Sequence, residues 1–161
     1  ETMRANPAAV FSYVPYRVIE GREVQGPVLP RRRRRYEGPC FESLYLRSVV
    51  ANSGVVARRD ALLAAGPLDE DRRVVEDHDM WLRLAKLGPV LFVDGPPLLH
   101  YRVVGGSHSS GVLRPLKRMI AVAWKHRGQV GLRLFALAVL VQTGDICVQR
   151  LLPHYGWRSH E

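Results

Sequence analysis

Residues 75–87 read VEDHDMWLRLAKL, and Gly88-Pro89, a pair that ends helices, follows them directly. Residues three and four positions apart share one side of a helix. By that rule one face collects four side chains: Asp77, Met80, Trp81 and Leu84. The stretch therefore predicts a helix over about 75–87, and an ionisable group begins the face that this helix should bury.

Strands and helices are expected to alternate on both sides of this helix. Before it, the sequence predicts a strand over 9–19, a loop over 26–39, a short helix over 41–48, a short buried strand over 53–58 and a helix over 59–65. After it, the sequence predicts strands over 90–93 and 98–104, a flexible loop over 105–111, and helices over 115–126 and 130–152, with Gly144 as a candidate break. Pro15 favours an edge position or a bulge for the first strand, because proline cannot donate to a strand ladder. The alternation predicts the α/β class.

The composition excludes several classes of protein. Of the 161 residues, 47% are hydrophobic, which is enough to build a core and argues against a disordered tail. Two cysteines, Cys40 and Cys147, are too few for a disulfide framework or a cysteine-rich zinc site, and they fit a reducing compartment. The most apolar stretch, 134–144, is much shorter than the roughly 20 residues that a membrane-spanning helix needs. We therefore predict a cytoplasmic protein without a transmembrane span.

The net charge of +9 is unevenly distributed along the chain. An acidic island, defined as residues 69–79, holds six carboxylates, and basic segments flank it on both sides. One of them contains the arginine run Arg31–Arg35. We interpret this run as a solvated loop. The alternatives are a guide for an anionic donor or a lipid-phosphate acceptor, and a contact for nucleic-acid phosphates.

Two carboxylates of the acidic island have different interpretations. Asp79 has Arg83 four residues later, which predicts a weak ion pair on the helix surface. Asp77 lies in the first helical turn, where backbone N–H groups and the helix dipole favour a carboxylate, and it shares its face with Met80 and Trp81. A carboxylate at the wet end of an apolar face is a common way to present a general base. We therefore take Asp77 as the candidate base and expect the helix N-terminus to favour its ionisation.

The segment 51–110 resembles the C-terminal half of family 2 glycosyltransferases, which have the GT-A fold. The pieces that carry the resemblance occur in order: Asn52-Ser53-Gly54-Val55-Val56 before Arg58-Arg59, Gly66-Pro67-Leu68-Asp69-Glu70, the stretch 75–84, Tyr101-Arg102-Val103 and the serine-rich loop at 107–110. A looser match extends back to 9–19. The resemblance implies a partial GT-A, Rossmann-like mixed sheet with flanking helices. Residues 1–111 would be the acceptor-side part of that domain, and 112–161 a helical tail.

The resemblance also implies an activity. Such enzymes invert the sugar while they transfer it from a nucleotide-sugar to a hydroxyl acceptor, often a lipid-linked or cell-envelope glycan. Asp77, the second acid of the family's Glu-Asp pair, would be the general base. Four further residues would bind substrate: Asn52, Ser53, Glu76 and Trp81. For the first two, a turn at the start of a strand is an equally good explanation.

Three departures from the family pattern concern the metal and the extent of the chain. The family's nucleotide-binding half ends in a metal-binding Asp-x-Asp after a buried strand. Residues 69–71 and 77–79 match that pattern by residue type, but neither follows an apolar strand, so we assign no metal site. Val104 stands where many relatives have a histidine, and His108 is only a weak substitute. Pro67-Leu68 replaces the usual Gly-Phe. We expect the nucleotide pocket and a Mg²⁺ or Mn²⁺ ion in a complete enzyme, of which this chain is an inactive part.

A second class of function stays open, namely a basic, non-catalytic module that binds the phosphates of anionic lipid or nucleic acid. Nucleic acid is the weaker partner, because no aromatic residues interleave with the arginine run and no nucleic-acid-binding signature accompanies it. Residues 114–152 could instead lie on the inner face of an anionic membrane as a peripheral contact, through an apolar stripe on the first tail helix. That stripe comprises Leu116, Met119, Ile120, Ala123 and Trp124. Packing of the stripe on its own domain is the simpler interpretation.

Overall fold

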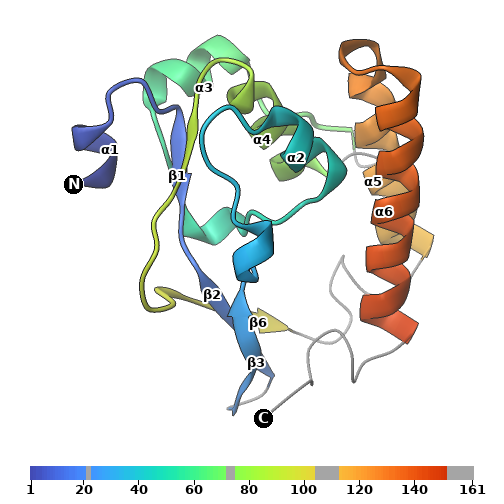
Figure 1. Ribbon diagram of the computed structural model, residues 1–161, viewed down its shortest axis with the longest axis horizontal. Coiled ribbons are helices and arrows are strands. Elements are labelled where there is room, and N and C mark those ends of the chain that lie inside the picture. The colour runs from blue at the N-terminus through green and yellow to red at the C-terminus, as the bar shows by residue number, and fades with distance from the viewer. Residues whose placement is uncertain (21–22, 72–74, 104–112, 152–161) are drawn as a thin grey trace.

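Pro15 divides the first extended segment of the chain into two strands, β1 (Phe11–Tyr13) and β2 (Tyr16–Glu20). In this computed structural model, which describes residues 1–20, 23–71, 75–103 and 113–151, each of these strands is the centre of a three-stranded sheet. The sheet around β1 lies in the upper part of Figure 1, and the sheet around β2 lies below it. The chain thus passes from the middle of one sheet directly into the middle of the other.

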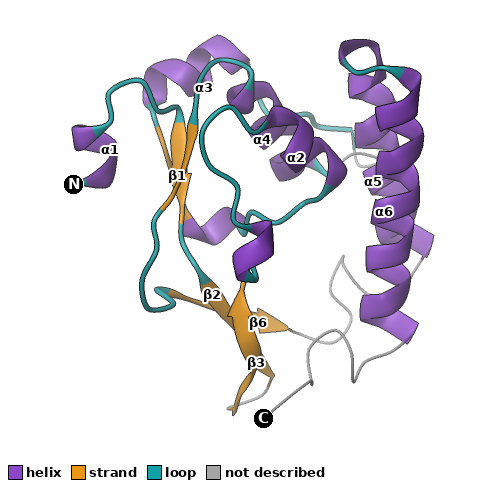
Figure 2. Cartoon of the chain, in the orientation of Figure 1, coloured by secondary structure: helices purple, strands orange, loops and turns teal. Residues whose placement is uncertain are grey.

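Both sheets are mixed. In the first, β4 (Val55–Ala57) runs antiparallel to β1, and β5 (Val90–Phe92) runs parallel to it. In the second, β3 (Glu23–Leu29) runs antiparallel to β2, and β6 (Leu99–Val103) runs parallel to it. One segment of the chain contains β1 and then β2, and a later segment contains β5 and then β6. Because β1 pairs with β5 and β2 pairs with β6, these two segments run side by side through both sheets (Figure 2). The α/β class is confirmed at this level.

Two predictions for the strands need correction. Pro15 does not mark an edge, because β1 and β2 are both central strands. The alternative, a bulge, is consistent with the register shift between Tyr16 and Val18 in the pairing of β2 with β3. Pro15 is fully buried in the short gap between β1 and β2, where a missing N–H breaks no ladder, and its carbonyl accepts a hydrogen bond from Leu98 N at 3.2 Å. The predicted loop over 26–39 is also wrong at its start, because β3 continues through Pro27 to Leu29 as an edge strand.

The helices other than α1, which was not predicted, follow the predicted ranges closely. The helix bounds are α1 (Thr2–Ala5), α2 (Phe41–Leu46), α3 (Arg59–Ala65), α4 (Glu76–Ala85), α5 (Leu113–His126) and α6 (Leu132–Leu151). Three 3-10 turns join them: η1 (Arg32–Arg34), η2 (Asn52–Gly54) and η3 (Arg127–Gln129). Gly66 ends α3 with a φ of 82°, a left-handed conformation that glycine adopts without strain. The break considered at Gly144 is absent, since α6 is continuous through it.

The strand predicted over 53–58 is confirmed as β4, but it is not buried. Val56, at its centre, is 62% exposed, because β4 is an edge strand of its sheet. The expected loop over 105–111 lies outside the described residues. No helix within the described ranges is long and apolar enough to cross a bilayer.

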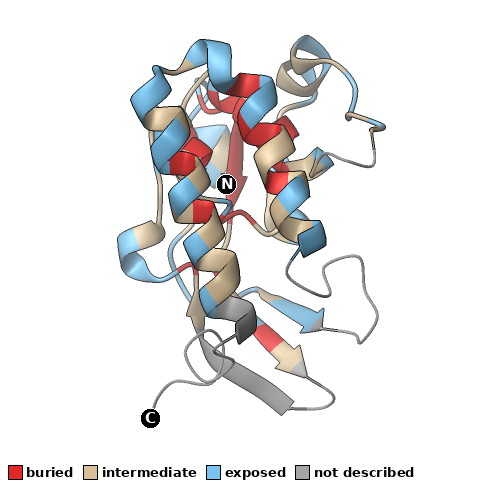
Figure 3. Ribbon diagram, turned by 90° about the vertical axis from the view of Figure 1, so that its right-hand side faces the viewer, coloured by how far each residue is buried: buried red, intermediate tan, exposed pale blue. Residues whose placement is uncertain are grey.

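The two tail helices share the hydrophobic core of the sheet domain. Val122 and Ala123 of α5 and Ala138 of α6 are buried in the same cluster as residues of β1, α2, α4 and β5. Tyr45 of α2 connects them: its hydroxyl donates to Ala123 O at 2.8 Å, and its own carbonyl accepts a hydrogen bond from the Gln142 amide at 2.8 Å. Figure 3 shows α5 and α6 side by side at the surface, each with buried residues on the side towards the domain. The tail therefore packs on its own domain.

Candidate functional site

The first turn of α4 presents two adjacent carboxylates in different surroundings. Glu76 is exposed, and its Oε2 lies 2.8 Å from an Nη of Arg118 on α5. Asp77 is half-buried, and its Oδ1 accepts a hydrogen bond from His78 N at 2.7 Å. The next buried residues of the same face, Met80 and Trp81, pack in the core. Asp77 therefore lies at the boundary between core and surface, as the helical periodicity predicted.

The environment of Asp77 raises the pKa of its carboxyl group. Burial is the main cause, and the neighbouring charge of Glu76 adds to it. The hydrogen bond from His78 N and the charge of Arg118 act in the opposite direction without cancelling these effects. As expected, the backbone N–H groups at the helix N-terminus favour ionisation, but the loss of solvation on burial outweighs them and sets the direction of the shift. As a carboxylate, Asp77 is a stronger base than an exposed aspartate.

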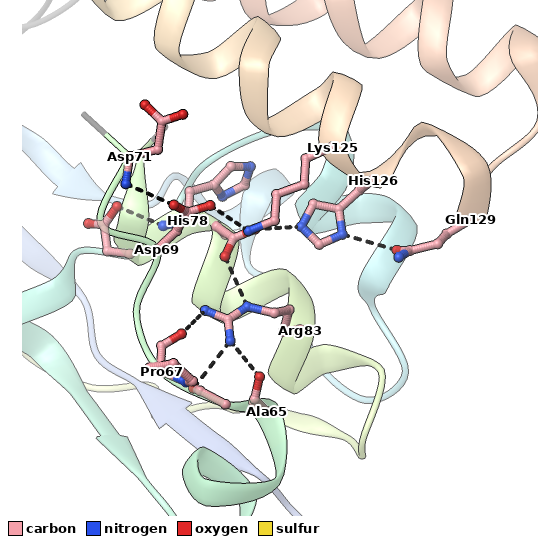
Figure 4. A network of polar contacts seen from close by, with 12 residues as sticks. Ala65, Pro67, Asp69, Asp71, His78, Arg83, Lys125, His126 and Gln129 are labelled. Atoms are coloured by element: carbon pink, nitrogen blue, oxygen red, sulfur yellow. Dashed lines mark hydrogen bonds and ion pairs between the residues drawn. The ribbon is translucent and has the colours of Figure 1, made fainter. Parts of the chain in front are cut away.

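Asp79, two residues further along α4, is the centre of an ion network, and Figure 4 labels its partners Arg83, Lys125 and His126. Its side chain is fully buried. Oδ2 accepts a hydrogen bond from Arg83 Nε at 2.9 Å, and Oδ1 lies 2.9 Å from Lys125 Nζ and 2.8 Å from His126 Nε2. The ion pair predicted for Asp79 and Arg83 is present, but the prediction that it lies on the helix surface is wrong: the Asp79 side chain is fully buried, and Lys125 and His126 of α5 also contact it.

The network keeps Asp79 ionised. Burial alone would raise the pKa of its carboxyl group, but the hydrogen bonds from His126 and Lys125, together with the charges of Lys125 and Arg83, lower that pKa well below the ordinary range. A buried carboxylate is stable only when its lone pairs are satisfied, and three donors satisfy those of Asp79.

The same network fixes the loop that precedes α4. Arg83 donates to the carbonyl oxygens of Ala65 and Gly66 and, at 2.9 Å, to that of Pro67. Lys125 Nζ also lies 2.7 Å from Asp69 Oδ2, so its ammonium group bridges two acids of the island. The end of α3, the helix α4 and the C-terminal turn of α5 are thus held together around one carboxylate. This arrangement positions the turn that carries Asp77.

His78 is buried beside this network without joining it. Its side chain is fully buried, and Nε2 has no hydrogen-bond partner. Burial, followed by repulsion from His126, lowers the pKa of His78 to about 4. The imidazole is therefore neutral at physiological pH. No motif in the sequence predicted a role for this residue.

The other predicted site residues are spread over several elements. Asn52 and Ser53 form the exposed turn η2 before β4. Trp81 is a core residue, 6% exposed, whose ring centroid lies 5.3 Å from that of Phe11. His108 lies outside the described residues. The structure therefore brings Glu76 and Asp77 together in one turn, and it places Trp81 inside the molecule.

The network around Asp79 could not have been found from sequence. Lys125 and His126 lie more than 40 residues after Asp79, and nothing in their local pattern points to α4. A basic pair at the end of a helix is usually assigned to solvent and to the helix dipole. The only available signal was the position of His126, at the C-terminus of an amphipathic helix that also has Met119 and Ala123 on its buried side.

A shallow, open depression of about 330 Å³ lies between the end of α3 and α4. Its lining is apolar and comprises Leu62, Leu63, Gly66, Pro67, Leu68 and Met80. Asp77 does not line it. Within residues 1–20, 23–71, 75–103 and 113–151, no group of three or more His, Cys, Asp or Glu side chains could hold a metal ion.

Comparison with models of known protein families finds no match to the chain, and comparison with curated proteins finds no significant match. The assignment of function therefore depends on the residues themselves and on the sequence motifs.

Proposed function

We infer that this chain is the acceptor-side part of an inverting glycosyltransferase of the family 2 type, with a GT-A fold, and that Asp77 is its general base. The observation that carries the proposal is the setting of Asp77 in the first turn of α4, half-buried and with a raised carboxyl pKa. The ordered motifs between residues 51 and 110 support it as a resemblance. The mixed sheets with flanking helices are compatible with such a domain.

The proposed chemistry uses Asp77 to remove one proton. An alcohol is a poor nucleophile at neutral pH, so its proton must leave as the oxygen attacks. The acceptor oxygen forms a bond to the anomeric carbon, and the bond from that carbon to the diphosphate oxygen breaks with its electron pair on the leaving diphosphate. The hydroxyl proton moves to a carboxylate oxygen of Asp77. A carboxylate whose pKa is raised by burial accepts that proton more readily than an exposed one.

Asp79 would act as a positioning residue. It contacts Arg83, Lys125 and His126 and thereby holds α4 against α5 and against the loop before it. Glu76, whose partner Arg118 belongs to α5, adds a second connection at the same end of the helix. The proposed reaction assigns no role to a metal ion bound by the described residues. The divalent cation and the nucleotide pocket are proposed for the complete protein.

The test uses the protein expressed with any coding sequence that lies upstream of Glu1. Release of nucleoside diphosphate from a panel of nucleotide-sugars is measured with glycan and lipid-linked acceptors. Asp77→Asn should lower the rate by at least roughly 100-fold, the usual contribution of a general base. Asp94→Asn, which changes a 74% exposed carboxylate paired with Arg35, is the control and should leave the rate unchanged. Full activity of Asp77→Asn, with an unchanged circular dichroism spectrum, would contradict the role of Asp77.

The basic, non-catalytic module is the second candidate. The observation in its favour is that Arg31, Arg32 and Arg33 are exposed and form no ion pair with any described residue. In such a module Asp77→Asn would have no effect. Neutralising the three arginines would weaken binding to anionic phosphates and flatten its dependence on salt.

A further inference from the structure

The outward side of α6 is apolar except for Arg133 in its first turn. Residues spaced three and four apart share one side of a helix, and on α6 the exposed positions follow that spacing. The outward stripe comprises Leu132 (82% exposed), Ala136, Leu137 (46%), Leu140 (70%), Gly144 and Val148 (43%). A helix that packs one side on a core normally presents polar residues on the other. This stripe is therefore an unpartnered apolar surface.

Exposed cations lie within the N-terminal half of the stripe and beside it. Arg133 is exposed on the second residue of α6, and Arg127 is exposed in the turn before it. The Arg127 guanidinium lies 3.8 Å from the ring centroid of Trp124, which is itself 55% exposed. The Trp124 ring in turn contacts Phe135 of α6, with centroids 5.9 Å apart. An exposed tryptophan beside arginines and apolar residues is typical of a protein surface at a lipid interface.

The arginine run approaches the other half of α6 from the inward side of the helix. Arg34 of the run, and Arg47, lie 3.1 and 3.2 Å from the carboxylate of Asp145, which is on the same side of α6 as the buried Ala138. These contacts place η1 beside the C-terminal half of α6, and Arg31–Arg33, within and next to η1, are exposed. The contacts with Arg34 and Arg47 also neutralise Asp145, which is the only acidic residue between Leu113 and Leu151. The described part of the α5–α6 hairpin therefore has no unpaired carboxylate.

We propose that the outward stripe of α6, together with Trp124 and the basic residues Arg31–Arg33, Arg127 and Arg133, binds the surface of an anionic lipid bilayer. Apolar side chains would enter the boundary between headgroups and acyl chains, and the arginines would contact lipid phosphates. A second copy of the chain is a poorer occupant, because two-fold pairing of α6 would bring identical basic residues together. The binding helix is α6 and not α5, whose predicted membrane-facing stripe is turned inward at Met119 and Ala123.

The experiment is flotation of the full chain with vesicles of pure phosphatidylcholine and of an equimolar mixture of phosphatidylcholine and phosphatidylglycerol. The chain should float with the anionic vesicles only. The double variant Leu132→Ser/Leu140→Ser should lower the partition coefficient by about tenfold or more, since two leucine side chains no longer enter the bilayer. Both positions are highly exposed, so folding should not suffer.

The matched control is Leu63→Ser/Leu98→Ser, which removes two leucines of similar exposure, 65% and 72%, from outside the hairpin. It should bind like the wild type. Replacing Arg31, Arg32 and Arg33 by serine should weaken binding and reduce its salt dependence. No flotation of the wild type with anionic vesicles would overturn the proposal, as would equal losses in the two leucine variants. A third outcome would also overturn it: the wild-type chain does not bind vesicles but forms a stable dimer, and Leu132→Ser/Leu140→Ser abolishes that dimer.

Vesicle binding is measured without any sugar transfer. Its failure would therefore leave the role proposed for Asp77 intact, and loss of that role would leave the lipid surface intact.

Discussion

His126 Nε2 of α5 lies 2.8 Å from Asp79 Oδ1 of α4, inside the protein. On its other side, His126 Nδ1 lies 3.0 Å from Gln129 Oε1 in the turn that begins α6. One imidazole ring therefore connects the tail to the helix that carries the candidate base. The tail contributes to the geometry of the site as well as to the core.

Asp79→Asn should strongly destabilise the protein. The substitution removes a buried charge, leaves the charges of Arg83 and Lys125 incompletely compensated, and weakens the hydrogen bond to His126. Breaking a buried ion network typically costs about 3–5 kcal/mol in the free energy of unfolding. Urea denaturation measures this change in the free energy of unfolding. Asp94→Asn, which disrupts the exposed pair with Arg35, is the control and should cost under roughly 1 kcal/mol. Similar losses in the two variants would show that the network around Asp79 is not buried in solution.

Asp77→Asn should stabilise the protein at neutral pH. The carboxyl pKa of Asp77 is higher in the folded than in the unfolded state, so the folded state binds this proton more tightly. The stability that follows is present below the unfolded pKa and is lost as the pH rises through the folded value. At pH 7 the ionised carboxylate therefore destabilises the folded state, and the neutral amide removes this destabilisation. The melting temperature should rise at neutral pH and change little in acid. A lower melting temperature at pH 7 would contradict the burial of this carboxylate.

His78 should make the protein sensitive to mild acid. Its pKa falls from the ordinary 6.5 to about 4 on folding, so the unfolded state binds a proton that the folded state does not. Stability is complete above about pH 6.5 and is lost as the pH falls towards 4. At pH 5 the loss from this residue is about 2 kcal/mol. His78→Leu should flatten the pH dependence of the free energy of unfolding between pH 7 and 5. Parallel profiles for the wild type and the variant would refute the explanation.

Docking of the tail can be tested with two alanines of α6. Ala138 is fully buried in the core, whereas Ala136, half a turn earlier, is exposed. Ala138→Asp places an unpaired carboxylate in the core and should cost several kcal/mol or detach the helix. Ala136→Asp should change the free energy of unfolding by less than about 0.5 kcal/mol. Chemical denaturation and hydrogen exchange of α5 and α6 measure both effects. Equal stability of the two variants would mean that α6 does not pack on the domain.

Local signals in the sequence were sufficient for the helices of the domain. The helix over 59–65 and the helix at 75–87 end at glycines, and their apolar spacing fixes the faces that they bury. The reason differs at the two glycines. Gly66 adopts a positive φ, whereas a Cβ on Gly88 would lie 2.9 Å from the carbonyl oxygen of Ala8. The pattern placed the end of this helix at residue 87, two residues beyond the observed end of α4 at Ala85, and the close contact at Gly88 depends on a distant segment.

The candidate site was predictable only where it depends on neighbours in the chain. The position of Asp77 at the start of a buried face follows from the helical period. Its raised pKa does not, because desolvation depends on what other elements cover. The substrate role given to Trp81 came from the resemblance, whereas its burial against Phe11 comes from the packing of α4 on β1. The types of side chain suggested candidate site residues, but only the packing of the fold determined how exposed those side chains are.

By itself the sequence determined most of the helices and strands and their order, although not α1 or β3, because turn residues and hydrophobic periods act over a few neighbouring positions. It also placed an acid at the boundary of the buried face of α4. Tertiary structure alone decided that Pro15 lies between two central strands and that Asp79 is enclosed by Lys125 and His126. The position of Pro15 and the enclosure of Asp79 have the same physical reason. Burial and ion pairing depend on residues brought together from distant parts of the chain, and short-range patterns do not encode those partners.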